Sequence, residues 1–255
     1  RQRRGSGSRA DSGQRMTEDL WESHATWWQR EFTNGVDPEY KEQILPLVAD
    51  LATGFEKILD IGCGEGQVAR TLPGDLSRVF GVDRSWAQVS EALARSAGEH
   101  YLQASASELP FQNETFDAAV ACLVFEHITD MSTAISEVAR VLRPEGRFVF
   151  LLNHPLLQTP GSGWVEEHTP ESSIQYWRIG QYLVEQETVE EVELGIRIPF
   201  IHRPLSVYLN TLTEQGLSLV RMLEPAPPEG FLERNDAYRS AQHIPRLLVL
   251  VCEKR

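Results

Sequence analysis

The chain has 255 residues, of which 41% are hydrophobic and 24% charged, and its formal net charge is −13 at pH 7. This length and composition exclude disorder throughout the chain and indicate a globular protein with one large domain. The acidic balance disfavours nucleic acid and anionic membrane as partners, and the sequence has no apolar run of 18 or more residues that would predict a membrane span.

The first 15 residues, RQRRGSGSRADSGQR, differ in composition from the rest of the chain. They are rich in Arg, Gly and Ser and contain no apolar residue larger than Ala10, so we expect a disordered tail. They hold five arginines and one aspartate, which leaves 19 basic and 36 acidic residues, a net charge of −17, in residues 16–255. The stretch also lacks the apolar face of a targeting peptide. We therefore expect one domain over residues 16–255.

Residues 16–54 are expected to form a helical cover that precedes the main sheet. The aromatic stretch LWESHATWWQREF is followed by DPEYKEQILPLVADLATG. In the second stretch Asp37 is suited to cap a helix, Pro38 suits the first helical turn, and Gly54 is suited to end the helix.

Short apolar runs alternate with helical periodicity through the core, residues 55–152. Five strands are predicted: FEKILDIG, RVFGVD, HYLQA, FDAAVACLVF and RFVFLLN. Three helices are predicted between them: GQVARTL, ended by Pro73 and Gly74; SWAQVSEALARSAG, capped by Ser85; and MSTAISEVARVL, capped by Asp130. Strands that are apolar along their whole length are buried on both faces, which requires helices on both sides of a mostly parallel sheet. The core is therefore predicted to be a doubly wound α/β structure.

Two segments complete the chain. Residues 153–203, from NHPLLQTPGSGW to the Glu-rich VEQETVEEVELGIRIPF, are too polar and too broken by Pro and Gly for another strand and helix, so we expect a lid insertion after strand five. Residues 204–255 predict the helix PLSVYLNTLTEQG and the strands LSLVRMLEP and PRLLVLVCEK. The fold class is therefore α/β, with a Rossmann-like seven-stranded sheet that is mostly parallel and has an antiparallel last strand.

Three glycines, Gly62, Gly64 and Gly66, follow the first strand within five residues. Ligands of open α/β sheets bind beyond the carboxyl ends of the strands, and glycine allows both a positive φ and close approach of a ligand to the main chain. We therefore predict a ligand at this loop. The alternative is a tight turn that needs glycine for its own geometry, but one glycine would suffice for such a turn.

The spacing of these glycines does not fit a dinucleotide fingerprint, because Gln67 stands where G-x-G-x-x-G requires its third glycine. An NAD-dependent reductase is therefore disfavoured. Asp83 ends the second strand, 21 residues after Gly62. A carboxylate at this position is suited to accept both ribose hydroxyls of an adenosine.

The order of five features resembles the class I S-adenosylmethionine-dependent methyltransferases. These are ILDIGCGEG, the acid that closes strand two, ELPF, FDAAVACLVFEHI and EVARVLRPEGRFVF. The flanks WWQREFTNGVDPEY, NHPLLQTPGSGW and IPFIHRPLSVYLNTL are similar to an actinobacterial group of small-molecule methyltransferases. The resemblance implies a bacterial enzyme that takes S-adenosylmethionine as cofactor and gives S-adenosylhomocysteine as product, and we expect it to be cytoplasmic. We expect a small organic acceptor that is methylated on oxygen or nitrogen.

The resemblance also assigns residues to the methionine end of the cofactor. It implies that the backbone of Gly62, Cys63 and Gly64 faces the methionine part and that Asp60 lies near the methionine ammonium. Leu123, which closes strand four, would contribute its carbonyl near the same ammonium.

At the nucleoside end, the resemblance implies that Asp83 holds the ribose and Arg84 flanks the adenine. Ser105 stands where relatives usually place Asp to take the adenine amino group; it accepts a hydrogen bond but carries no charge. The amide of Ala106 remains suited to the adenine. Two aromatic residues of the N-terminal segment are expected, from position alone, to cover the cofactor: Trp28 and Tyr40.

An oxygen or nitrogen acceptor must lose a proton, and His is the side chain best suited to take it near neutral pH. Three candidate bases follow predicted strands or precede the late helix: His127, His154 and His202. The alternative for His127 is a helix-start residue bonded to nearby backbone, and for His154 a residue that stabilises a turn. For His202 a structural role stays open.

Other features of the sequence narrow the function further. The end of strand four reads CLVFEH instead of the polar Pro-Pro-aromatic turn of enzymes that methylate nucleic-acid bases, which favours a small-molecule acceptor. No His, Cys or carboxylate set has the spacing of metal ligands, so no metal is predicted. The three cysteines predict reduced core thiols in a cytosolic protein. A non-catalytic sensor or partner subunit that binds S-adenosylmethionine stays as the alternative function.

Two groups of side chains in the insertion have open roles. Four aromatic residues are suited either to an acceptor pocket or to a small core of the lid itself: Trp164, Tyr176, Trp177 and Tyr182. The five glutamates between residues 185 and 193 are typical of a solvated face.

Overall fold

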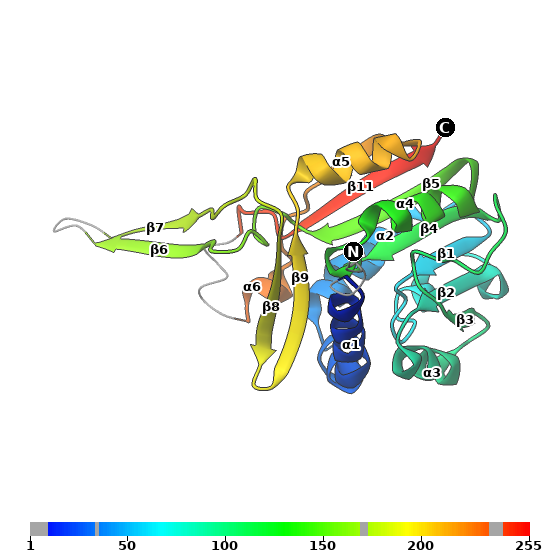
Figure 1. Ribbon diagram of the computed structural model, residues 1–255, viewed down its shortest axis with the longest axis horizontal. Coiled ribbons are helices and arrows are strands. Elements are labelled where there is room, and N and C mark those ends of the chain that lie inside the picture. The colour runs from blue at the N-terminus through cyan, green and yellow to red at the C-terminus, as the bar shows by residue number, and fades with distance from the viewer. Residues whose placement is uncertain (1–9, 34–35, 169–172, 235–241) are drawn as a thin grey trace, which may run out of the picture.

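A seven-stranded sheet lies at the centre of the protein (Figure 1). The computed structural model describes all residues except 1–9, 34–35, 169–172 and 235–241. The sheet order is β10-β11-β5-β4-β1-β2-β3. Its strands are β1 (Ile58–Ile61), β2 (Val79–Asp83), β3 (His100–Gln103), β4 (Phe116–Cys122), β5 (Leu142–Asn153), β10 (Leu217–Leu223) and β11 (Leu247–Lys254).

The direction of the strands confirms the predicted sheet. β1 pairs in parallel with β2 on one side and with β4 on the other. In turn, β2 pairs in parallel with β3, and β4 pairs in parallel with β5. The last strand, β11, is antiparallel to both of its neighbours, β5 and β10. The order places β1 beside the point where the chain changes direction across the sheet, which is where ligands bind in such folds.

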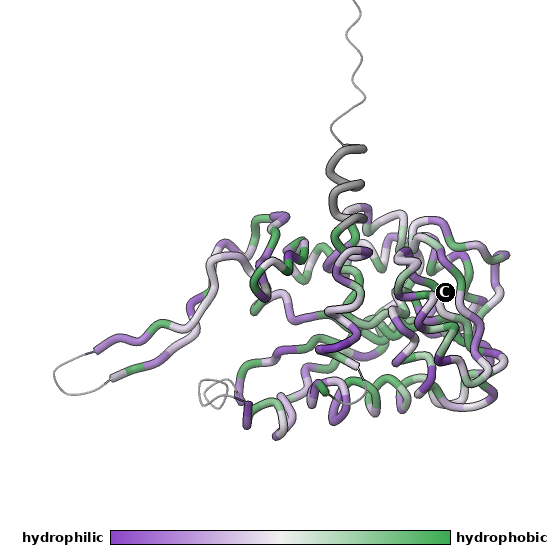
Figure 2. The backbone as a smooth tube through the Cα atoms, turned by 90° about the horizontal axis from the view of Figure 1, so that it is seen from below, coloured by the Kyte–Doolittle hydropathy of each residue, from purple (hydrophilic) through white to green (hydrophobic). Residues whose placement is uncertain are grey.

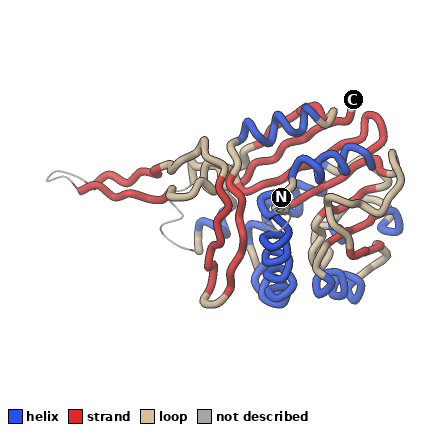
Figure 3. Tube along the Cα trace, in the orientation of Figure 1, coloured by secondary structure: helices blue, strands red, loops and turns tan. Residues whose placement is uncertain are grey.

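Helices cover both faces of the sheet, as the unbroken apolar strands predict (Figure 3). Their bounds are α1 (Ala10–Phe32), α2 (Leu45–Leu51), α3 (Trp86–Arg95), α4 (Met131–Val141), α5 (Leu205–Glu214) and α6 (Glu229–Leu232). One apolar core joins the sheet to α4 and α5, and a second joins the opposite face to α2 and α3. Neighbouring residues of a strand alternate between the cores: Leu59 belongs to the first and Ile58 to the second.

The predicted caps of α3 and α4 are confirmed. Ser85 Oγ accepts the N–H of Gln88 at 3.3 Å, and Asp130 Oδ1 accepts the N–H of Thr133 at 3.1 Å. The helix predicted after Gly66 is wrong: only a 3-10 turn, Ala69–Thr71, forms there. The glycine loop has positive φ as far as Gly66, so too few residues remain before the proline and glycine at 73 and 74 for a regular helix.

The N-terminal segment is helical, with two differences from the prediction. Residues 1–9 of the expected tail lie outside the described residues, and α1 begins at Ala10, inside the stretch expected to be disordered. Asp37 caps the second helix as predicted, since its Oδ1 accepts the N–H of Glu39 at 2.7 Å. That helix passes through a π-helical turn, Tyr40–Ile44, before α2. Pro46 has no N–H to donate, which accounts for the wider turn.

The insertion consists of two antiparallel hairpins (Figure 1). Their strands are β6 (Gly163–His168) with β7 (Ser173–Arg178), and β8 (Gln186–Glu193) with β9 (Ile196–His202). Figures 1 and 2 show that β6 and β7 project away from the body, whereas β8 and β9 lie beside α1. None of the described helices combines the length and apolar character that crossing a bilayer requires.

Candidate functional site

A cavity opens beyond the carboxyl ends of β1, β2 and β4. Its wall comes from the loops after these strands and after β3, and from α1 and the π-helical turn. Ten of the thirteen predicted site residues line it: Trp28, Gly62, Cys63, Gly64, Asp83, Arg84, Ser105, Ala106, Leu123 and His127. Tyr40, expected from position to cover the cofactor, lines it as well. The fold thus brings together residues that are up to 99 positions apart in the sequence.

The three glycines of the first loop serve different purposes. All have positive φ, 70° at Gly62, 54° at Gly64 and 84° at Gly66. A Cβ at Gly62 would collide with Val124, and one at Gly66 would collide with the Tyr101 hydroxyl. At Gly64 no described atom lies within 4 Å of the Cβ position. The packing of the protein itself therefore excludes a side chain at Gly62 and Gly66, whereas at Gly64 only the positive φ calls for glycine and the space beside the main chain stays open.

Asp83 faces this loop from the end of β2. Its Oδ2 accepts the N–H of Gly64 at 3.0 Å and its Oδ1 accepts the N–H of Ser85 at 2.8 Å. Burial raises the pKa of this carboxyl, and the two amides oppose the shift. Each carboxylate oxygen has a second lone pair. Both oxygens can therefore accept one hydroxyl each from a vicinal diol such as a ribose.

The adenine end of the predicted site is built from the loop after β3. Ser105 Oγ accepts the N–H of Ser107 at 3.2 Å, so its hydroxyl still has a donor and a lone pair for a ligand. Ala106 and the exposed Arg84 line the same part of the cavity. A neutral hydroxyl thus lies at the position where the resemblance leads us to expect a carboxylate.

Two residues predicted to lie at the methionine end differ in exposure. Leu123 lines the cavity and has φ 58°, a conformation that is rare for a branched residue and common at functional sites. Asp60 does not line the wall: it is 1% exposed, and its Oδ2 has no hydrogen-bond partner among the described residues. Burial raises the pKa of Asp60 to about 7, although a hydrogen bond from the Ala69 amide lowers this pKa. The structure therefore places this carboxyl behind the loop.

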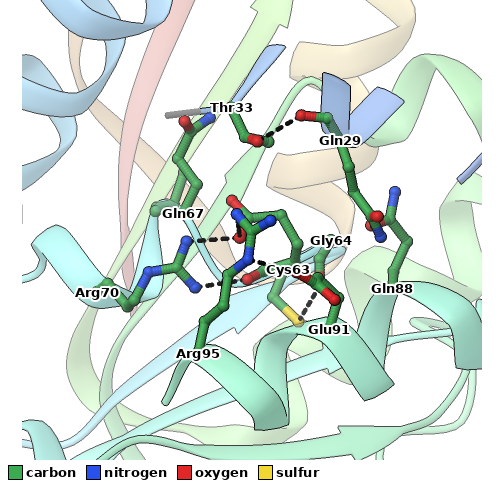
Figure 4. Close-up of polar contacts among 12 residues, drawn as sticks. Gln29, Thr33, Cys63, Gly64, Gln67, Arg70, Gln88, Glu91 and Arg95 are labelled. Carbon is green, nitrogen blue, oxygen red and sulfur yellow. Dashed lines mark hydrogen bonds and ion pairs between the residues drawn. The ribbon is translucent and has the colours of Figure 1, made fainter. Parts of the chain in front are cut away.

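A buried ion-pair network holds the glycine loop in place (Figure 4). Glu65 is 2% exposed, and its Oε2 lies 2.6 Å from Arg70 Nη2 and 2.9 Å from Arg95 Nη1. Arg70 Nη1 also donates to the Glu65 carbonyl at 2.6 Å. Glu65 lines the cavity. Sequence reasoning missed it, because its partners come from η2 (Ala69–Thr71) and α3 and no local pattern links them.

Helix α1 covers the cavity through polar contacts. Figure 4 shows Gln29 of α1 facing Gln88 of α3, and Gln29 Nε2 donates to Gln88 Oε1 at 3.0 Å. Gln67 Nε2 donates to the carbonyl of Phe32 at 3.1 Å. Glu22 accepts from the Ser85 hydroxyl at 2.6 Å. These contacts hold two tryptophans of α1 on the cavity wall: Trp21 and Trp28.

His127 is the one predicted base that lines this cavity. Its Nδ1 lies 2.6 Å from the carbonyl of Pro199. A carbonyl only accepts, so Nδ1 carries the proton and Nε2 of the neutral ring is an acceptor. The ring lies 4.7 Å from the rings of both Trp21 and Phe200. Burial lowers the pKa of His127 to about 4, so the ring stays neutral at physiological pH.

The other two predicted bases lie away from the cavity. His154 Nδ1 accepts the N–H of Leu156 at 3.1 Å, and its Nε2 lies 2.9 Å from Glu224 Oε1. Both ring nitrogens of this buried residue are engaged, as in the turn-stabilising alternative. His202 Nε2 lies 2.8 Å from the carbonyl of Tyr182, and the residue lines a second, smaller cavity.

The aromatic residues of the insertion do not line the main cavity within the part of the chain that the structure describes. The rings of Trp164 and Trp177 pack edge to face across β6 and β7 at 5.4 Å. The Tyr182 hydroxyl accepts the N–H of Leu205 at 3.0 Å. Among the glutamates of the insertion, Glu193 accepts a hydrogen bond from the indole N–H of Trp27 on α1. The cysteines are all buried and free of disulfides.

Comparison with known proteins agrees with this geometry. Residues 59–150 match the family model described as a methyltransferase domain. The chain is 37% identical over 102 residues to a malonyl-[acyl-carrier protein] O-methyltransferase of Salmonella typhimurium, covering 39% of this chain and 41% of that protein. It is 28% identical over 204 residues to an uncharacterised 37.1 kDa protein in transposon TN4556 of Streptomyces fradiae, covering 74% of this chain and 57% of that protein. The chain thus spans less than two thirds of the length of both relatives.

Among solved structures, an S-adenosylmethionine-dependent methyltransferase from Mesorhizobium loti superimposes with a TM-score of 0.70 and 25% identity. The superposition covers 86% of this chain and 98% of the other. The likeness therefore extends well beyond residues 59–150, which the family model matches.

Proposed function

We propose that this chain, a member of the class I S-adenosylmethionine-dependent methyltransferases, transfers a methyl group from S-adenosylmethionine to oxygen or nitrogen of a small organic acceptor. The observation that carries the proposal is a single cavity that contains an open main-chain position at Gly64, a carboxylate with free lone pairs at Asp83 and a neutral acceptor nitrogen at His127.

The residues present fit the cofactor. The main chain at Cys63 and Gly64 would face the methionine part, the Asp83 carboxylate would accept the ribose hydroxyls, and Ser105 and Ala106 would contact the adenine. When bound, the cofactor supplies a methyl group activated by a sulfonium, and the product is S-adenosylhomocysteine. The polypeptide has to orient the acceptor and exclude water.

Orientation and exclusion of water are the larger contributions of the chain. An in-line displacement gains roughly 7–11 kcal/mol when both reactants are held in the productive geometry. Trp21 and Trp28 lie on the cavity wall beneath α1, and their rings are 5.6 Å apart. The rings meet edge to face, and an apolar wall of this kind keeps water from the reacting atoms and packs against an acceptor from one side.

His127 is proposed to accept the proton of the acceptor. Its Nε2 is unprotonated at neutral pH, and the Pro199 carbonyl fixes the ring by accepting from Nδ1. The acceptor atom gains positive charge as it bonds to carbon, so its O–H or N–H becomes acidic during the reaction. A weakly basic imidazole suffices to take that proton.

The cytoplasm of a bacterium is the proposed location. Three buried cysteines without disulfides support it, because reducing compartments keep thiols free. The bacterial assignment rests on the resemblance of the flanking segments to actinobacterial enzymes.

Two measurements test the proposal. Calorimetry with S-adenosylmethionine should give micromolar or tighter affinity, and absence of binding at millimolar cofactor would contradict it. Release of S-adenosylhomocysteine should then be followed across a panel of phenols and amines. His127→Ala should lower the rate about a hundredfold or more while cofactor affinity is unchanged. His168→Ala, at an exposed histidine of β6, is the control. Binding without turnover of any acceptor would favour the non-catalytic sensor.

A further inference from the structure

The loop that carries His127 has little regular structure of its own. It runs from Leu123 to Asp130, between β4 and α4, and its helical part is the three-residue 3-10 turn η4 (Phe125–His127). A turn this short makes few internal hydrogen bonds, so the carbonyls of the loop need donors from elsewhere. The place of the His127 ring on the wall of the main cavity therefore depends on contacts from other elements.

Arg203 supplies donors to three of these carbonyls. The residue follows β9 and is 5% exposed. Its Nη1 donates to the carbonyl of Phe125 at 3.1 Å, and its Nη2 donates to the carbonyls of Ile128 and Thr129 at 2.7 and 3.0 Å. The guanidinium thus binds the backbone on both sides of His127.

The same strand also holds the ring of His127. The carbonyl of Pro199, four residues before Arg203, accepts from Nδ1 of the imidazole at 2.6 Å. Strand β9 therefore contacts the ring, and the residue that follows the strand contacts the peptide groups that flank it. Pro204 comes next and restricts the backbone of Arg203 to extended conformations, which limits the directions open to its side chain.

The guanidinium holds the loop through carbonyls rather than through an ion pair. Its contact with a carboxylate, from Nε to Glu185 at 3.8 Å, is longer than a hydrogen bond. A planar fork reaches several carbonyls in different directions, and bonds from a charged donor are stronger than neutral ones. Burying a charge is costly, and apolar side chains would fill the same space at lower cost. Arginine at this place therefore indicates that these carbonyls have to be held at fixed positions.

We propose that Arg203 is a positioning residue: by binding three carbonyls of the loop after β4, it keeps the imidazole of His127 bonded to Pro199, with Nε2 available to the acceptor. This inference rests on the proposed function. Arg203 itself does not line the main cavity, so it acts through His127. Without its bonds the loop can shift, and a displacement of about 1 Å at a reacting group can lower a rate about a hundredfold.

The tautomer of His127 tests this inference without an acceptor. Nitrogen NMR of the full chain, labelled with nitrogen-15 in histidine and kept near neutral pH, shows which ring nitrogen carries the proton, and His127→Gln identifies the signals. The wild type should carry the proton on Nδ1. Arg203→Met keeps an apolar stem and removes every donor. It should lose the Nδ1–H form as the major tautomer, because the ring is no longer held against the Pro199 carbonyl.

Arg203→Lys is the second variant and decides the question if Arg203→Met does not fold. One ammonium restores the charge and some donors but does not match the fork, so the Nδ1–H share should lie between those of the wild type and Arg203→Met. Arg197→Met, at an exposed arginine of β9, is the matched control and should keep the wild-type tautomer. His154 is the internal reference: a general loss of structure would change its signals, whereas a loss of positioning leaves them unaltered.

An unchanged His127 tautomer in either Arg203 variant that folds would overturn the inference, and so would an equal change in Arg197→Met. S-adenosylhomocysteine is titrated into the same samples by calorimetry, and its affinity should differ by less than about twofold between them, because Arg203 lies outside the main cavity. No binding to the wild type would count against the proposed function alone. A wild-type proton on Nε2 would count against both.

Discussion

The strands β1 to β5 and the hairpins β6 to β9 form two regions that are held together in different ways. Every residue of β1 is buried, and in β4 only Asp117 is partly exposed. In the insertion that carries the hairpins large apolar side chains stay exposed, 83% at Leu183 between β7 and β8 and 95% at Leu194 between β8 and β9. The sheet is thus specified by many buried contacts, whereas the hairpins depend on few. This difference indicates where a substitution should have a large effect and where a small one.

The few contacts of the hairpin β8–β9 nevertheless complete the site. The Pro199 carbonyl sets the tautomer of His127, and Glu193 accepts from Trp27 on α1. In the proposed site, the sheet would supply the contacts to the cofactor and the hairpin would supply the side that faces the acceptor. Substitutions in the sheet should therefore act on cofactor affinity and stability, and those in the cover on how firmly the site is closed.

The largest effect is expected for Asp83→Ala in the sheet region. The substitution removes the acceptor of two backbone amides and, in the proposed site, of the ribose hydroxyls. Hydrogen bonds to charged groups contribute about 1.5–3 kcal/mol each, so the Kd for S-adenosylmethionine should rise about a hundredfold to a thousandfold. Calorimetry measures it. Asp75→Ala, at an exposed cap away from the cavity, is the control. A rise below tenfold in Asp83→Ala would contradict the assignment of this carboxylate to the ribose.

The second prediction separates the two kinds of glycine within the loop. Gly66→Ala places a methyl group against Tyr101 at positive φ and should lower the free energy of unfolding by about 3 kcal/mol. Gly64→Ala meets no described atom and should cost about 1 kcal/mol, the strain of alanine in the left-handed region. It should instead weaken cofactor binding. Urea denaturation measures the first effect, and equal losses of stability would refute the distinction.

The third prediction concerns the buried carboxyl behind the loop. The folded-state pKa of Asp60 is raised to about 7, so the folded protein binds a proton that the unfolded chain has already released. Stability from this group is therefore present at low pH and lost as pH rises through about 7. Relative to Asp60→Asn, the wild type should lose about 2 kcal/mol between roughly pH 5.5 and pH 8. Unfolding at both pH values measures it, with Asp50→Asn, at an exposed aspartate of α2, as control. Parallel pH profiles of wild type and Asp60→Asn would disprove it.

The same contrast explains what the sequence could predict. The order and direction of the strands follow from apolar runs, because burial on both faces leaves a direct trace in composition. The caps at Ser85 and Asp130 follow from local chemistry. The two hairpins were not predicted, since their strands are exposed and carry no such trace. A turn signal existed at Gly195, which has φ 82°, between β8 and β9.

The site shows the same limit. Residues that line the cavity through their own loop, such as Gly64 and Asp83, could be placed from spacing after a strand. The choice among the histidines could not, because it depends on the Pro199 carbonyl, 72 residues from His127 in the chain. His154 and His202 follow the same pattern in the sequence but bond to Glu224 and Tyr182 instead. Long-range contacts therefore decide which histidine lines the main cavity.

The smallest effect is expected in the cover. Glu22 of α1 accepts from the Ser85 hydroxyl and from the N–H of Ala87 at the start of α3. Glu22→Ala removes these bonds at an exposed site. Their loss should cost about 1 kcal/mol of binding free energy, so cofactor affinity should fall about fivefold. Glu31→Ala, on the same helix but bonded to its neighbour Arg30, is the matched control. Stopped-flow release of S-adenosylhomocysteine should be faster in Glu22→Ala alone.

The size of that change decides whether α1 is a cover or part of the binding site itself. A loss as large as that of Asp83→Ala would mean that the cofactor depends on α1 as much as on the sheet, and the two regions would not differ. No change in release would mean that the polar contacts beneath Trp21 and Trp28 do not hold the helix closed. A fivefold change with unaltered stability fits a helix that docks through a few exposed bonds onto a site already formed by the strands.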